Sequence, residues 1–131
     1  MLTNKTMKQH ILVVDDEEPI RELLSAYFKK HGYEVTSAGT AEEAQTLADN
    51  ATLNLIILDI ALPDADGLEV LSLLRNSHPN LPIVILTGMG FDEELFQEAR
   101  GKGASAYVSK TLPLDQLLME VVRTLKYHSK G

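Results

Sequence analysis

The sequence predicts an α/β fold: a doubly wound, five-stranded parallel sheet with helices on both faces. Short apolar runs alternate with segments of helical periodicity five times along the 131 residues. Five strand–helix units in series favour a parallel sheet, because each helix carries the chain back to the edge where the next strand begins. Runs such as LIIL at 55–58 are apolar at every position, which is typical of strands buried on both faces.

Each expected strand is a short run of β-branched or aliphatic residues. The third run is the clearest, the second is the weakest, and the fourth is entered through Pro82. The expected strands cover residues 11–14, 33–38, 55–58, 83–86 and 104–109.

Each expected helix places its apolar residues on one face, at spacings of three and four. Pro19 suits the first turn of the first helix, and Gly32 ends that helix. Thr40 and Glu43 have the spacing of a capping box at the start of the second helix. One-faced spacing covers residues 20–28, 44–48, 68–74 and 114–125, and a shorter, poorly patterned helix is expected over about 92–100.

These elements fill a single domain, since 131 residues are enough for one hydrophobic core. We expect the domain over residues 10–127, with a flexible N-terminal segment at 1–9 and a C-terminal tail at 128–131.

Composition excludes several classes of function. The formal charge of −7 argues against direct binding to nucleic acid or to an anionic membrane surface, since both need concentrated positive charge. The chain has no cysteine, so it holds neither a disulfide nor a thiolate metal site. Its longest apolar runs are about five or six residues, against the ~20 that a membrane-spanning helix needs. We therefore expect a cytoplasmic protein.

Polar residues follow four of the five expected strands. Asp15 and Asp16 come after the first, Asp59 after the third, Thr87 after the fourth and Lys110 after the fifth. In a doubly wound sheet the ligand site lies beyond the carboxyl ends of the strands. Crowded carboxylates repel one another unless a proton or a hard cation intervenes, and Mg²⁺ suits such a cluster. The two acids at 17–18 are explained by a helix N-terminus, and we assign them no role.

Each of these residues also has an ordinary structural explanation when taken alone. The acidic pair can be a solvated loop, Lys110 a surface lysine and Thr87 a turn or cap residue. A single aspartate such as Asp59 is common after a strand, and Tyr107 reads as a half-buried aromatic residue of the fifth strand. Their joint placement at one edge of the sheet favours a functional site.

With these residues assembled, the chain closely resembles the receiver domains of two-component response regulators. The resemblance covers about residues 8–127 and implies a flavodoxin-like strand order of 2-1-3-4-5. The segments that carry it are ILVVDDE at 11–17, LDIALPDADG at 58–67, LTG at 86–88 and AYVSK at 106–110.

The resemblance implies a phosphorylation site that depends on a metal. Asp59 would accept a phosphoryl group from a histidine kinase or a histidine phosphotransferase. Asp16, Asp59 and the Ala61 carbonyl would bind Mg²⁺, with Asp15 assisting. The protein would catalyse only its own phosphorylation and dephosphorylation, and would not be an enzyme acting on other substrates.

The resemblance also implies a switch. Lys110 would contact the phosphoryl group, Thr87 would reach toward it, and Tyr107 would change rotamer with it. The face formed by the fourth helix, the fifth strand and the fifth helix would then bind a downstream protein target. In such a switch, a local change of charge shifts the equilibrium between two conformations of the protein.

The chain departs from the family pattern at three positions. Thr111 follows Lys110 where the family commonly has proline, so the usual cis peptide bond is not expected. Ala61 and Met89 occupy positions that often tune the lifetime of the phosphoryl group, and neither side chain can orient water through a polar group. We hypothesise slow dephosphorylation.

Three alternatives stay open from the sequence. The chain can be a receiver-like binding module that never takes phosphate. A phosphohydrolase of the haloacid dehalogenase type normally has a second aspartate two positions after the nucleophile, where this chain has Ala61. A flavodoxin-like electron carrier needs a hydroxyl-rich loop after the first strand, where four acids stand. The cognate kinase, the output and the oligomeric state are not determined by the sequence.

Overall fold

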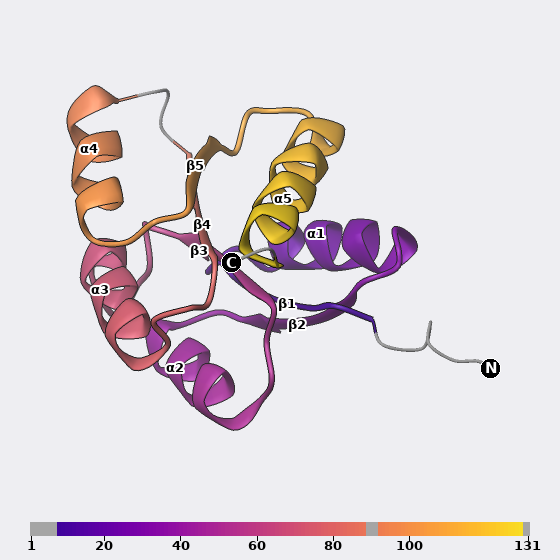
Figure 1. Ribbon diagram of the computed structural model, residues 1–131, viewed down its shortest axis with the longest axis horizontal. Coiled ribbons are helices and arrows are strands. Elements are labelled where there is room, and N and C mark those ends of the chain that lie inside the picture. The colour runs from indigo at the N-terminus through magenta and orange to yellow at the C-terminus, as the bar shows by residue number, and fades with distance from the viewer. Residues whose placement is uncertain (1–7, 89–91, 130–131) are drawn as a thin grey trace.

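The computed structural model describes residues 8–88 and 92–129 and shows a parallel sheet between two layers of helices (Figure 1). The strands are β1 (His10–Val14), β2 (Glu34–Ala38), β3 (Leu55–Asp59), β4 (Ile83–Thr87) and β5 (Ala106–Ser109). The helices are α1 (Glu18–Lys30), α2 (Ala41–Asn50), α3 (Gly67–Ser77), α4 (Glu93–Gly101) and α5 (Leu114–Ser129).

The sheet has the order β2-β1-β3-β4-β5, and every neighbouring pair is parallel. This confirms the predicted fold class and strand order. Differences are confined to the ends of elements. The second and fifth strands begin later than expected, at Glu34 and Ala106. Helix α5 continues to Ser129, past the expected domain boundary at 127. The part of the expected N-terminal segment at 1–7 lies outside the described residues, as do 130–131.

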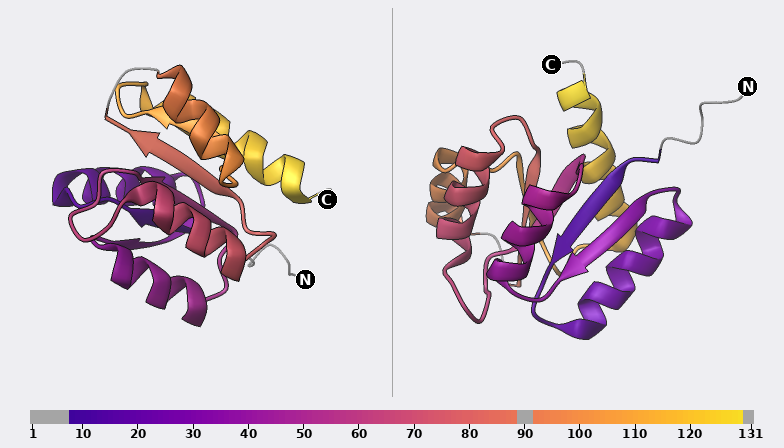
Figure 2. Two further views of the ribbon diagram at one scale, coloured as in Figure 1. Left: turned by 90° about the vertical axis from the view of Figure 1, so that its left-hand side faces the viewer. Right: turned by 90° about the horizontal axis from the view of Figure 1, so that it is seen from below.

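Two hydrophobic cores follow from the alternation of side chains along the strands. Alternate residues of each strand face opposite sides of the sheet. Those on one side, such as Leu12 and Leu58, pack with α2, α3 and α4, and those on the other, such as Val13 and Ile57, pack with α1 and α5. Figure 2 shows the sheet between these two layers. Because both faces are covered, β3 and β4 are buried along their whole lengths.

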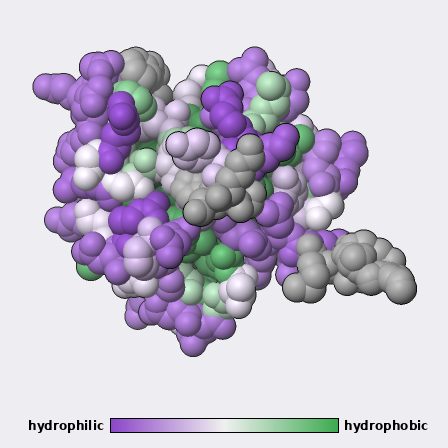
Figure 3. Space-filling view, in the orientation of Figure 1, coloured by the Kyte–Doolittle hydropathy of each residue, from purple (hydrophilic) through white to green (hydrophobic). Residues whose placement is uncertain are grey.

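The surface is that of an ordinary folded domain. The face in Figure 3 is mainly hydrophilic, and apolar residues show there in small separate patches. Among the described residues, no helix has the length and apolar character needed to cross a membrane.

Helix α2 begins at the predicted cap. Thr40 Oγ1 accepts a hydrogen bond from the Glu43 amide at 3.1 Å. The Glu43 carboxylate accepts one from the amide of Gly39 at 2.8 Å, one residue before the amide that a standard capping box uses. The first bond satisfies an amide that the helix itself leaves free, and the second holds the chain just before the cap.

Arg75, near the end of α3, joins two loops at the amino edge of the sheet. Its Nη2 and Nε donate to the Gly103 carbonyl at 2.7 and 3.1 Å. Its Nη1 donates to the carbonyls of Leu81, Pro79 and His78 at 2.6, 3.0 and 3.2 Å. Gly103 has a φ of +107°, and a Cβ there would lie 2.7 Å from the Arg75 side chain. Burial lowers the pKa of Arg75 from its usual value.

Candidate functional site

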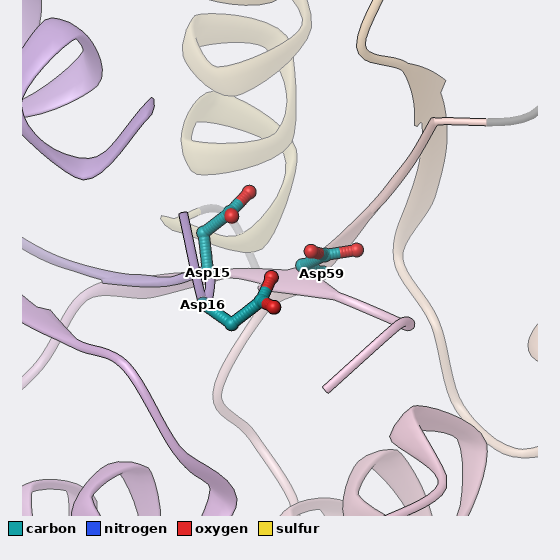
Figure 4. Close-up of side chains that lie close together, drawn as sticks. All are labelled: Asp15, Asp16 and Asp59. Atoms are coloured by element: carbon teal, nitrogen blue, oxygen red, sulfur yellow. The ribbon is translucent and has the colours of Figure 1, made fainter. Parts of the chain in front are cut away.

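The structure brings the predicted polar residues together at the carboxyl edge of the sheet. Asp15 and Asp16 follow β1, and Asp59 is the last residue of the buried strand β3. One carboxylate oxygen from each of the three residues lies within 4.8 Å of the other two. Figure 4 shows the three side chains gathered at the ends of these two neighbouring strands.

The three carboxylates differ in their access to solvent. Asp15 is 0% exposed and Asp59 is 1% exposed, whereas Asp16 is exposed. A buried carboxylate is unfavourable unless an opposite charge or hydrogen bonds compensate for the water it loses. The cluster therefore needs cations nearby.

Lys110 supplies one such cation. Its Nζ lies 2.9 Å from Asp15 Oδ2, 3.1 Å from Asp59 Oδ2 and 3.1 Å from Glu17 Oε1. Burial disfavours the charged lysine, but these carboxylates outweigh burial and raise its pKa above the usual value. Glu17 was assigned no role from the sequence, because its place before a helix explains an acid there equally well.

Both oxygens of Asp59 have partners. Oδ1 accepts a hydrogen bond from the Ala61 amide at 3.0 Å, and Oδ2 accepts one from Lys110 at 3.1 Å. Burial raises the pKa of Asp59, and the nearby charge of Asp15 adds to the rise, while the bonds from Ala61 and Lys110 oppose it. The carboxylate is thus held in one orientation at the end of a rigid strand.

Hydrogen bonds to the amide, the side chain and the carbonyl of Asp15 fix the turn after β1. The Asp15 amide donates to the Ala38 carbonyl at 3.1 Å, and Asp15 Oδ1 accepts from the Glu17 amide at 2.9 Å. Arg21 Nη1 donates to the Asp15 carbonyl at 2.7 Å. Arg21 was not predicted as a site residue, since its place on the α1 surface carries no sequence signal of this contact.

Thr87 and Tyr107 lie on the neighbouring strands β4 and β5. Thr87 is 1% exposed, and its carbonyl accepts a hydrogen bond from the Lys110 amide at 2.7 Å. Burial raises the pKa of Tyr107, and the charge of Asp92 adds to this, while a side-chain hydrogen bond with Thr87 opposes both. The Tyr107 ring meets the Phe96 ring of α4 edge to face at 5.7 Å. Two residues of the predicted switch therefore lie on the same face of adjacent strands, and Tyr107 contacts helix α4 through Phe96.

The balance of charge suits a divalent cation. The carboxylates of Asp15, Asp16, Asp59 and Glu17 share a single ammonium, that of Lys110, so an excess of negative charge is left to be matched. Oxygen ligands from carboxylates and carbonyls are those that Mg²⁺ and Ca²⁺ prefer. The donor set therefore fits a hard divalent metal.

Comparison with known proteins identifies the family and the fold. The profile of the response regulator receiver domain matches residues 11–122. The chain belongs to this family. The transcriptional regulatory protein SrrA of Staphylococcus aureus is 35% identical over 120 residues, which are 92% of this chain and 49% of that protein. The chain thus spans about half the length of the curated relatives it matches.

Solved structures of receiver domains agree with this assignment. The CheY-like receiver domain protein from Methanospirillum hungatei superposes with a TM-score of 0.89 at 31% identity, over 95% of this chain and 98% of that one. A response regulator from Burkholderia pseudomallei, crystallised with a phosphorylated aspartic acid, calcium ion and citrate, gives 0.79 at 28% identity, over 85% and 65%. Receiver domains of response regulators interact with histidine kinases and with effector domains.

The structure also describes two of the departures of this receiver domain from the family pattern. Thr111 follows Lys110 in a tight turn, where its amide donates to Ser109 Oγ at 3.1 Å. No cis peptide bond occurs in the described residues, as expected from the missing proline. Ala61 is exposed beside Asp59. Met89 lies outside the described residues.

A groove of about 500 Å³ opens at the opposite, amino edge of the sheet. Its lining includes Asn54, His78 and Leu81 and contains none of the predicted site residues. The charges and hydrogen bonds at the carboxyl edge therefore mark the candidate site of this receiver domain, although the large groove lies at the other edge.

Proposed function

We propose that this receiver domain is a phosphorylation-dependent switch that accepts a phosphoryl group on Asp59. The observation that carries the proposal is the Asp59 carboxylate, held between the Ala61 amide and Lys110 inside an acidic cluster that fits a divalent metal. The response regulator from Burkholderia pseudomallei that holds a phosphorylated aspartic acid and a calcium ion supports the same chemistry here.

The proposed reaction is a phosphoryl transfer from a phosphohistidine of a histidine kinase or a histidine phosphotransferase. An oxygen of the Asp59 carboxylate forms a bond to phosphorus as the bond from phosphorus to the histidine nitrogen breaks. The product is an acyl phosphate on Asp59, and the donor histidine is left free. In this proposal the domain catalyses only its own phosphorylation and dephosphorylation and does not act on other substrates.

Residues of this chain would supply the positioning and the charge. Asp16, Asp59 and the Ala61 carbonyl would hold Mg²⁺, and Asp15 would assist. When bound, the metal neutralises charge on the phosphoryl oxygens. Lys110 would transfer its ion pair from Asp59 to the phosphoryl group, because the acyl phosphate consumes one carboxylate oxygen.

The output would pass through Thr87 and Tyr107. A hydrogen bond from Thr87 to a phosphoryl oxygen would change the surroundings of the neighbouring Tyr107, and the tyrosine would change rotamer. Since Tyr107 packs on Phe96 of α4, this change would bias the face of α4, β5 and α5, where a downstream protein target would bind. We expect this to occur in the cytoplasm and without direct contact between this acidic domain and nucleic acid.

Intact mass spectrometry tests the proposal. The protein is incubated with acetyl phosphate and Mg²⁺, beside an Asp59→Asn variant and a sample with chelator. Asp49→Asn is the matched control, because Asp49 is an exposed acid paired with His78 at 3.0 Å, far from the acidic cluster. We expect one added phosphoryl group in the wild type and the control, and none in the other two samples. No addition to the folded wild type would instead indicate a phosphate-independent binding module.

Slow dephosphorylation is a separate expectation. Ala61→Asn places an amide next to Asp59, where it can orient an attacking water. We expect a shorter phosphoryl half-life in this variant, measured by the loss of the added mass after the donor is removed. An unchanged half-life would count against a role for position 61 in setting the lifetime.

A further inference from the structure

The loop between β3 and α3 (residues 60–66, the β3–α3 loop) is closed tightly on itself. The Gly67 amide donates to the Ile60 carbonyl at 3.1 Å, and Ala61 and Asp66 form an isolated antiparallel bridge. A Cβ at Gly67 would lie only 2.3 Å from Ile60 Cα, so glycine is required for this closure. The two ends of the loop are therefore locked together directly beside Asp59.

Asp64 ties this closed loop to a different element. Its Oδ1 accepts a hydrogen bond from the Ala41 amide at 2.9 Å, and its Oδ2 accepts one from the Glu42 amide at 3.3 Å. Ala41 and Glu42 open helix α2, where amides are free and the helix dipole favours a negative charge. The hydrogen bond from the Ala41 amide lowers the pKa of Asp64 most, and the bond from the Glu42 amide lowers it further.

Helix α2 has a cap of its own and does not depend on Asp64 alone. Thr40 Oγ1 accepts from the Glu43 amide, and Glu43 in turn accepts from the Gly39 amide. The bonds made by Asp64 are thus additional, and they cross from one element to another. Their distinct effect is to hold the β3–α3 loop against the start of α2.

The position of this loop determines the orientation of Asp59. The Ala61 amide, inside the loop, donates to Asp59 Oδ1 at 3.0 Å, while Lys110 holds Oδ2. We propose that Asp64 is a positioning residue for the phosphoacceptor: it anchors the β3–α3 loop to helix α2 and thereby fixes the Ala61 amide that orients the Asp59 carboxylate. This inference rests on the proposed function of Asp59 for its catalytic consequence, but its geometric part is independent of phosphorylation.

Two variants separate positioning from helix stability. Asp64→Ala removes the link between the loop and α2, and Thr40→Ala removes a cap of the same helix without touching the loop. Both lose hydrogen bonds in the first turn of α2, so both are expected to lower thermal stability. Asp64→Asn keeps a carbonyl oxygen that can accept one of the two bonds.

The first readout is the backbone amide of Ala61 in ¹⁵N-labelled protein without phosphoryl donor. We expect Asp64→Ala to shift this resonance and to speed its hydrogen exchange by about 10-fold, since the loop loses an anchor. Thr40→Ala should leave the resonance in place, and Asp64→Asn should fall between Asp64→Ala and the wild type.

The second readout is function. We expect Asp64→Ala to weaken Mg²⁺ binding and to slow phosphorylation by acetyl phosphate by about 10-fold. This is the lower end of the loss found when residues that orient the ligands of a metal site are mutated. An equal slowing in Thr40→Ala would overturn the inference, because α2 stability alone would then explain the effect. An unmoved Ala61 amide in Asp64→Ala, or in Asp64→Asn if the alanine variant does not fold, would also overturn it. A wild type that takes no phosphoryl group would refute the proposed function, while the Ala61 readout still decides the geometric inference.

Discussion

Replacing Lys110 with methionine should destabilise this protein most strongly at neutral pH. The change removes the ammonium that lies 2.9 Å from Asp15 and 3.1 Å from Asp59, two carboxylates that are 0% and 1% exposed. Removing one partner of a buried ion pair costs about 3–5 kcal/mol, because the remaining charge has neither water nor a counterion. The Lys110 side chain is itself 18% exposed, so solvent screens part of the interaction and we expect a loss of about 2–4 kcal/mol.

The loss should shrink in acid. Burial already raises the pKa of Asp59, so the folded protein takes up this proton more readily than the unfolded chain. A raised carboxyl pKa lowers stability as the pH rises through the folded value, and this penalty disappears below the unfolded value. Loss of Lys110 raises the pKa of Asp59 further, because one of the groups that opposed the rise is gone. The difference between variant and wild type is therefore largest near pH 7 and smaller near pH 4.

Urea unfolding followed by far-ultraviolet circular dichroism measures this effect in a chain without tryptophan. With a slope of about 2 kcal/mol per molar urea, the midpoint should fall by about 1–2 M. Lys30→Met, at an exposed lysine of α1, is the matched control and should shift little. Adding Asp59→Asn to Lys110→Met should recover part of the loss. Equal midpoints for Lys110→Met and the wild type at pH 7, or a loss that does not depend on pH, would refute the electrostatic reasoning.

Two further pairs of variants test the packing. Gly67→Ala should destabilise by about 2–3 kcal/mol in urea unfolding, since its Cβ would lie 2.3 Å from the Ile60 backbone, whereas Gly101→Ala has nothing within 4 Å and should stabilise the end of α4 by about 0.5–1 kcal/mol. Arg75→Ala should cost about 1–3 kcal/mol, because partly buried loop carbonyls lose their donor. Arg123→Ala, at a side chain that is 70% exposed, should stay within about 0.5 kcal/mol. Equal effects within either pair would contradict the packing and hydrogen bonds described.

Sequence patterns were sufficient for the architecture because burial on two faces leaves a strong signal. The runs at 55–58 and 83–86 are apolar at every position, and they became the two fully buried strands. The second strand was the weakest expectation. Strands β2 and β5 form the two edges of the sheet, where one neighbour is missing and burial is partial. Their first residues were misplaced because half-exposed positions tolerate many residue types.

The sequence also predicted where the site residues lie along the backbone, but it did not predict the side-chain contacts between them. Topology alone carries Asp15, Asp59 and Lys110 to one edge, since parallel strands end on the same side. The contact of Glu17 with Lys110 and that of Asp64 with α2 depend on side-chain direction and on which loops meet in space. An exposed acid in a loop or before a helix has the same sequence pattern whether or not it makes such a contact.

The completion of the sheet has a consequence for synthesis of the protein. Lys110 reaches Asp15 and Asp59 only after β5 has paired with β4, where the Lys110 amide bonds to Thr87. A growing chain carries Asp59 long before it carries Lys110, which balances the charge of Asp59. If Asp59 accepts a phosphoryl group as proposed, an incomplete copy would offer this carboxylate without the lysine that the proposed transfer uses.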